Sequence, residues 1–185
     1  MSGTFIISGL IAASVVWAIA LYNRLVRKKN MVEEGWSGID VQLKRRSNLI
    51  PNLVETVKGY KVHEKDVLEN VTTLRAQSMN AEKPGEKGAA EGLLGAALGR
   101  LFAVAENYPD LKASQNFIEL QDSLREVEDQ IQLARRYYNG AVRDLNILVE
   151  SFPSNIIANM FKFIEAEFFE LEDPDECAVP GVSFD

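Results

Sequence analysis

The sequence has almost none of the residues that build disulfides and zinc sites, since its 185 residues include one cysteine and one histidine. A single cysteine forms no internal disulfide, which excludes a small disulfide-stabilised secreted domain. One histidine and one cysteine are also too few for a His/Cys zinc site. A positive charge balance is missing as well, because 27 acidic against 20 basic side chains give a net charge of −7. That balance argues against nucleic acid as a partner.

Motifs of known catalytic sites are also lacking. His63 and Glu64 would begin the helical zinc-protease motif, but that motif needs a second histidine four residues after the first, where the chain has Val67. The sequence contains no glycine-rich phosphate loop. We therefore expect no catalytic residue, metal, cofactor or small-molecule substrate. His63 is interpreted as a surface or capping residue, with pH sensing as the alternative.

Charged residues are absent from the first 23 positions, where a largely apolar run of 18 residues extends from Phe5 to Tyr22. About 17–25 such residues span the hydrocarbon of a bilayer as a helix. A secretory signal peptide has its positive charges before the apolar run, whereas here they follow it. The sequence therefore predicts an uncleaved anchor over residues 1–30 whose basic flank keeps the rest of the chain cytoplasmic. The flanking residues are two aromatic side chains suited to the interface and four cations: Trp17, Tyr22, Arg24, Arg27, Lys28 and Lys29.

Apolar residues then recur every seven positions in two interleaved series that only Arg46 and Glu64 interrupt. This spacing, typical of coiled coils, predicts a long helix with one apolar face. Pro51 lacks the amide hydrogen and clashes with the preceding turn, so we expect a kink or break near residues 47–50. The two series are Trp36, Leu43, Ile50, Val57, Glu64 and Val71, and Val32, Ile39, Arg46, Leu53, Tyr60, Val67 and Leu74.

A loop over residues 80–89 is expected to precede a short helix over residues 90–107. This helix carries a stripe of small side chains, which allow another backbone to approach closely. We favour tight packing inside a bundle, and a membrane-facing or subunit-facing helix is the alternative. The stripe consists of Gly92, Ala96, Gly99 and Ala103.

Two more helices complete the predicted fold. One ends near Ser151 and places eleven uncharged residues, from Phe117 to Phe152, on its core face. The other covers residues 154–171. The sequence thus predicts an all-α protein, in which a transmembrane helix precedes an antiparallel, up-and-down four-helix bundle with a long kinked first helix. The bundle covers residues 31–171, and an acidic extended tail covers residues 172–185.

The stretch from Trp36 to Tyr60, followed by His63 and Glu64, closely resembles the LemA family of bacterial membrane proteins. Further matches follow in order along the chain, at residues 106–112 (ENYPDLK), 134–139 (ARRYYN) and 152–155 (FPSN). The resemblance implies a single-pass protein of the bacterial cytoplasmic (inner) membrane with a four-helix up-and-down bundle. It implies no agreed enzymatic activity.

The candidate interaction residues centre on a basic cluster in the first long helix, Lys44 to Arg46. Arg46 falls on the core face, where a buried charge needs a partner. We favour a buried ion pair that fixes the register of the helices, and a basic collar acting on anionic lipid is the alternative. The candidate partners of Arg46 are Asp40, Glu128 and Asp129.

Arg135 and Arg136 are expected to pair with acidic residues of a neighbouring helix, while Tyr138 belongs to the core. The complete set of candidate interaction or register residues is Trp36, Asp40, Lys44, Arg45, Arg46, Pro51, His63, Glu64, Arg135, Arg136 and Tyr138.

These features favour a non-enzymatic, membrane-anchored helical scaffold that self-associates or docks other envelope proteins. Its expected partners are the lipid bilayer and either copies of itself or other membrane proteins. The alternative is a lipid-organising or membrane-remodelling protein that uses its basic juxtamembrane region.

Overall fold

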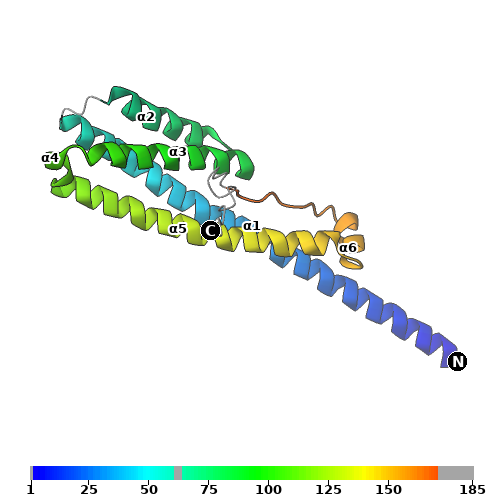
Figure 1. Ribbon diagram of the computed structural model, residues 1–185. Coiled ribbons are helices and arrows are strands. Elements are labelled where there is room, and N and C mark those ends of the chain that lie inside the picture. Colours follow the sequence, from blue (N-terminus) through cyan, green and yellow to red (C-terminus); the bar gives the residue numbers. More distant parts are fainter. Residues whose placement is uncertain (1, 61–63, 171–185) are drawn as a thin grey trace, which may run out of the picture. The chain divides into compact units, whose positions relative to one another are not determined.

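The computed structural model describes residues 2–60 and 64–170, and within these ranges the chain is all-helical with no strand (Figure 1). The predicted all-α class is therefore confirmed. His63 and the acidic tail over residues 172–185 lie outside the described residues. The helices are α1 (Ser2–Gly59), α2 (Lys65–Asn80), α3 (Pro84–Ala105), α4 (Pro109–Lys112), α5 (Gln115–Glu150) and α6 (Ser154–Met160).

The chain divides into two compact units, and both α1 and α5 contribute to each. The anchor unit contains the residues up to Asp40 together with Gln132–Phe168. The core unit contains Val41–Ile131 together with the described residues from Phe169 onward. Each unit is described by itself below.

Helix α1 continues through Pro51 to Gly59, so of the kink or break expected near residues 47–50 the break is absent, and the kink stays a prediction. Proline removes the amide donor to the carbonyl four residues earlier, which here is the carbonyl of Ser47. The Nε of Arg75 donates a hydrogen bond of 2.7 Å to that carbonyl oxygen and replaces the missing donor. The expected continuation of this helix to Leu74 is wrong, because α1 ends at Gly59 and α2 begins at Lys65.

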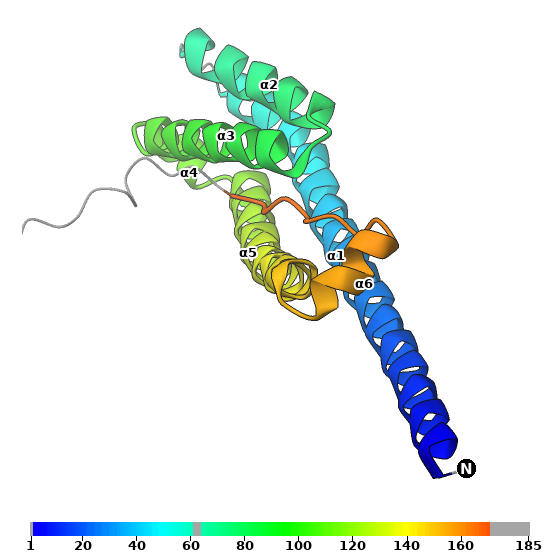
Figure 2. The same cartoon turned by 90° about the vertical axis from the view of Figure 1, so that its right-hand side faces the viewer.

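The apolar core of the core unit is built from one face of each of its helices. The predicted positions Ile50, Leu53 and Val57 on α1 are buried, as the seven-residue spacing requires. Helices α2 and α3 lie side by side (Figures 1 and 2). Their buried side chains complete the core with those of α4 and α5, and include Leu68, Val71, Leu94, Leu101, Leu111, Phe117 and Leu124.

Helix α3 begins at Pro84, so the loop expected over residues 80–89 is reduced to a few residues after α2. Proline is compatible with the first turn of a helix because the amide hydrogens of that turn have no helical acceptor. The interior position favoured for the small residues is also wrong. Of the four small residues, Ala96, Gly99 and Ala103 are exposed and Gly92 is half-buried, while Leu94, Leu98 and Leu101 face the core.

Helix α5 ends at Glu150, as predicted, and its core face from Phe117 to Leu148 is buried, with only Leu120 and Ala134 half-buried. Phe152 is the exception. It was expected on the core face but is 80% exposed, because it follows the last helical turn and the helical spacing no longer applies to it.

The last helix is much shorter than predicted, since α6 ends at Met160 rather than near residue 171. Lys162 adopts a left-handed conformation with φ of 58°. The amide of Phe163 donates to the carbonyl of Ala158 at 2.9 Å, and that of Lys162 to the carbonyl of Asn159 at 3.3 Å. This pair of bonds is the Schellman motif that terminates a helix.

Residues 163–170 have no regular secondary structure. In the anchor unit, the side-chain amide of Asn146 holds this segment through both backbone groups of Ala166, with distances of 2.8 and 3.0 Å. The hydroxyl of Tyr138 donates to the carbonyl of Glu167 at 2.7 Å. In the core unit, Phe169 is fully buried.

Candidate functional site

A buried polar cluster lies inside the otherwise apolar core unit. Arg46 of α1, Ser78 of α2 and Glu91 of α3 are all at most 4% exposed. Glu128 of α5 joins them from a half-buried position. The four long helices therefore each contribute one polar side chain to the same site.

The guanidinium of Arg46 connects the members of this cluster. Its Nη1 donates to Oε2 of Glu128 at 2.6 Å. Its Nη2 forms an ion pair with the carboxylate of Glu91 and lies 3.4 Å from the backbone carbonyl oxygen of the same residue. The hydroxyl of Ser78 donates to the other carboxylate oxygen of Glu91. The buried charges of Arg46 and Glu91 are thus paired, as burial requires.

The electrostatics of the cluster are dominated by desolvation. Burial lowers the pKa of Arg46 from its ordinary value, and the carboxylate of Glu128 opposes this shift by its charge and its hydrogen bond. Removing one partner of such a buried pair strongly destabilises the fold, because the other charge is left buried without a partner. The cluster can therefore restrict how the four helices align.

Glu128 is one of the three partners that the sequence offered for Arg46, whereas Glu91 was missed. The signal was present, since Glu91 is spaced by three, seven and ten residues from Leu94, Leu98 and Leu101. That spacing places it on the apolar face of α3. The two basic neighbours of Arg46 are exposed, and Arg45 approaches Glu126 at 3.4 Å.

The basic flank of the apolar run belongs to the anchor unit, where two of its four cations form ion pairs. Lys28 binds Asp144 of α5 at 2.8 Å, and this hydrogen bond lowers the pKa of the carboxyl group of Asp144. Lys29 lies 3.6 Å from Glu33 one helical turn later. Arg24 and Arg27 are exposed.

Trp36 and Tyr138 connect α1 to α5 within the anchor unit, with ring centroids 5.6 Å apart. Gly35 permits this close approach, because a Cβ added there would lie 3.0 Å from the Cα of Tyr138. Tyr138 is buried, and desolvation raises its pKa to about 12. Arg135 is half-buried, and Arg136 donates to the carbonyl of Gln132 in its own helix at 3.4 Å.

Two of the described helices are long and apolar enough to cross a membrane, by length and composition alone. In α1 none of the apolar window near the N-terminus is buried. In α3 the window is partly buried, as expected for a core helix of a soluble domain. Trp17 and Tyr22 of α1 are both exposed near the end of its apolar run.

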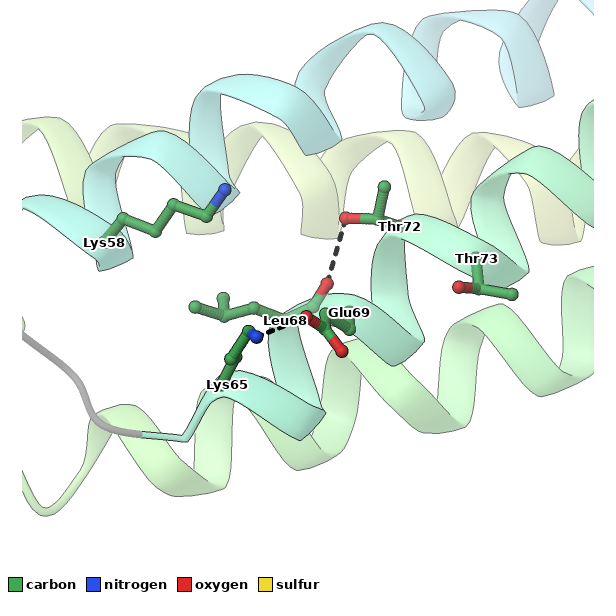
Figure 3. Close-up of a pocket in the computed structure, with 6 residues that line it drawn as sticks. All are labelled: Lys58, Lys65, Leu68, Glu69, Thr72 and Thr73. Atoms are coloured by element: carbon green, nitrogen blue, oxygen red, sulfur yellow. Dashed lines mark hydrogen bonds and ion pairs between the residues drawn. The ribbon is translucent and has the colours of Figure 1, made fainter.

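An open pocket of about 400 Å³ lies between the end of α1 and the start of α2 (Figure 3). Three of its polar side chains, Lys65, Glu69 and Thr72, have partners within α2. Figure 3 shows the ammonium of Lys65 against the carboxylate of Glu69, 3.3 Å away, and the hydroxyl of Thr72 donating to the carbonyl of Leu68 at 2.9 Å. Lys58 lies in the last turn of α1, where a cation interacts favourably with the helix dipole. We therefore interpret these contacts as local to the two helix ends.

Comparison with known proteins matches residues 35–184 to the model of the LemA family. The chain is 28% identical over 186 residues to magnetosome protein MamQ 2 of Paramagnetospirillum magneticum, covering 86% of this chain and 68% of that protein. It is 25% identical over 185 residues to magnetosome protein MamQ of Magnetospirillum gryphiswaldense, with the same coverage. Protein LemA of Metamycoplasma hominis is 26% identical over 155 residues, covering 82% of this chain and 69% of that protein.

Proposed function

The chain belongs to the LemA family, and on that premise we propose that it is a non-enzymatic scaffold, anchored in a membrane by α1, that associates with further copies of itself. The anchor is supported by the exposed apolar window of α1, which has the length that a bilayer requires. Two of the relatives named above are magnetosome proteins, and an association with a membrane is compatible with that origin.

The observation that carries self-association is the exposed face of α3, formed by Leu93, Ala96, Gly99 and Ala103 and here called the α3 face. Leu93 is 57% exposed, and a Cβ added at Gly99 would meet no atom within 4 Å. Within the described chain, nothing therefore packs closely against Gly99. Small residues spaced by three or four positions allow two helices to approach closely, so the α3 face suits a second copy of the same helix.

A protein partner fits the α3 face better than lipid does. Arg100 is exposed and follows Leu93 and Ala96 at helical spacing, which places a cation on the same side of α3. A cation within the hydrocarbon of a bilayer costs several kcal/mol. At an interface between proteins it can remain at the rim in contact with water.

The polar cluster supports the scaffold by fixing the register of the helices that present the α3 face. Glu91 belongs to α3 itself, and its ion pair with Arg46 is satisfied only when α3 and α1 are aligned as observed. Register-specific buried polar groups are known to select one packing arrangement at some expense of stability. We assign this role to Arg46 and Glu91.

The proposed topology is a single pass through the bacterial inner membrane, with the residues after the anchor in the cytoplasm. The cations after the apolar run support this orientation. The pairing of Lys28 with Asp144 and of Lys29 with Glu33 favours a scaffold over a lipid-remodelling function, because these charges are partly neutralised within the protein. Labelling Cys177 in intact cells with a membrane-impermeant maleimide should fail, and labelling from outside would contradict the orientation.

Disulfide cross-linking tests the α3 face directly. In a Cys177→Ser background, Ala96→Cys should give a covalent dimer in isolated membranes. Gln130→Cys, at an exposed position of α5 in the same unit, should not. Equal cross-linking at both positions would indicate random collision and would count against the proposal.

A further inference from the structure

The surface around α6 exposes a concentration of large apolar side chains, here called the α6 patch. Its five members are between 52% and 80% exposed, although soluble monomers rarely leave a contiguous apolar surface uncovered. They are Phe152, Ile156, Met160, Phe161 and Ile164.

The distribution of apolar residues on α6 is two-sided. Ile157 and Ala158 are buried against the anchor unit, whereas Ile156 and Met160 lie one turn apart on the outer face. No charged residue occurs from Ser151 to Phe161, and the first charge after this stretch is the cation of Lys162. The outer face of α6 is therefore apolar and uncharged, as a surface that is buried away from water must be.

The position of the α6 patch identifies what covers it. Tyr22 is the last residue of the apolar run of α1, and its ring centroid lies 4.7 Å from that of Phe161 and 5.9 Å from that of Phe163. Figures 1 and 2 both show α6 beside α1, with the N-terminal part of α1 continuing beyond it. If the run of α1 spans the bilayer, Tyr22 lies at its interface and Phe161 lies at the same depth.

From this geometry we infer that the α6 patch inserts into the interface of the bilayer that α1 crosses, as a second and shallow membrane contact. The inference rests on the proposed anchor. Ile156, Met160 and Phe161 enter the boundary between head groups and acyl chains, as the apolar faces of interfacial helices do. The contact fixes the tilt of the anchor unit relative to the membrane, because both α1 and the α6 patch are then attached to the same bilayer.

Accessibility of a nitroxide spin label tests this contact in the full chain, reconstituted into vesicles of equal parts phosphatidylcholine and phosphatidylglycerol. Single cysteines are placed in a Cys177→Ser background at Ile156 and at Met160. Ile7, exposed on the apolar run, reports whether the anchor is inserted, and Arg136, exposed on α5 of the same unit, is the control in water. Collisions with oxygen report acyl chains, and collisions with a water-soluble nickel chelate report water.

We expect the labels at Ile156 and Met160 to collide with the nickel chelate several-fold less than the label at Arg136, and to collide readily with oxygen. Nickel accessibility equal to that at Arg136, with Ile7 in lipid, would overturn the α6 contact and leave the anchor intact. Protection from both reagents would mean that protein covers the patch, which also overturns it. A water-exposed label at Ile7 would refute the anchor and the α6 contact together.

Discussion

The side chain of Arg75 donates a 2.7 Å hydrogen bond to the backbone carbonyl of Ser47, the acceptor that Pro51 leaves without a helical donor. A side chain of α2 thus supplies the hydrogen bond that is missing from the backbone of α1. The bond explains how α1 continues unbroken through a proline in its interior, because a buried carbonyl without a donor is costly.

Replacing Arg75 by methionine should destabilise the full chain by about 2 kcal/mol, the usual contribution of a hydrogen bond from a charged donor. In a Pro51→Ala background the same replacement should cost about 1 kcal/mol or less, since the introduced alanine supplies an amide donor to the carbonyl of Ser47. Urea unfolding of the four variants in detergent, followed by circular dichroism, measures this coupling. An equal cost in both backgrounds would show that Arg75 does not replace the missing donor.

Removing one member of the buried cluster should be far more damaging than removing an exposed ion pair. Glu91→Ala removes the buried carboxylate and leaves the guanidinium of Arg46 with the half-buried Glu128 and the backbone carbonyl of residue 91, and we expect a loss of about 3–5 kcal/mol in the free energy of unfolding. The matched control is Glu126→Ala, which breaks the exposed pair with Arg45 on the same two helices as Arg46 and Glu128 and should cost about 0–1 kcal/mol. Similar losses for the two variants in urea unfolding would contradict the account of the cluster.

Two glycines of α3 should respond to alanine in opposite directions. A Cβ at Gly88 would clash with the carbonyl oxygen of Glu170 and lie 3.0 Å from its carbonyl carbon. Gly88→Ala should therefore displace the segment around Phe169, cost about 1–3 kcal/mol and increase hydrogen exchange there. A Cβ at Gly95 meets nothing within 4 Å, so Gly95→Ala should stabilise α3 by up to about 1 kcal/mol. Stabilisation by Gly88→Ala would show that the segment does not pack there.

Tyr138 should make stability depend on alkaline pH. Its pKa is raised to about 12 in the folded chain, mainly by desolvation, against about 10 in the unfolded chain. The unfolded state therefore loses this proton first, and the stabilisation present below pH 10 is lost as pH rises towards 12. We expect the free energy of unfolding of wild type to exceed that of Tyr138→Phe by about 1 kcal/mol at pH 8. At about pH 11 the two free energies should be equal.

The variant Tyr137→Phe provides the control, because Tyr137 is exposed and its hydroxyl donates only a long hydrogen bond, 3.3 Å, to Glu34. It should change stability little at pH 8. A Tyr138→Phe difference that stays constant from pH 8 to pH 11 would contradict the buried, neutral phenol.

The elements predicted best from the sequence are those whose core positions follow one uninterrupted spacing. Helix α5 was located to within a few residues, because its apolar positions from Phe117 to Leu148 contain no charge. The apolar run of α1 was equally clear. The burial of Ile50, Leu53 and Val57 followed from the same reasoning.

The features that were missed depend on contacts distant in sequence or on local backbone geometry. The spacing of Glu91 from Leu94 and Leu98 places it on the apolar face of α3, but its partners Arg46 and Ser78 belong to helices distant in sequence, so the pairing was missed. The end of α6 depends on a left-handed Lys162, which the sequence does not mark with the glycine usual at that position. The continuity of α1 at Pro51 depends on Arg75, which belongs to another helix.

The central claim, self-association through the α3 face, is tested most directly by multi-angle light scattering of the full chain in detergent. Wild type and the control Gln130→Leu should form oligomers with the same distribution of masses, above the mass of one chain. Gly99→Leu should shift this distribution towards the monomer while the helical circular dichroism is unchanged, because the added side chain has space within its own chain. A strictly monomeric wild type at high concentration, or a Gly99→Leu variant that associates as wild type does, would contradict the account.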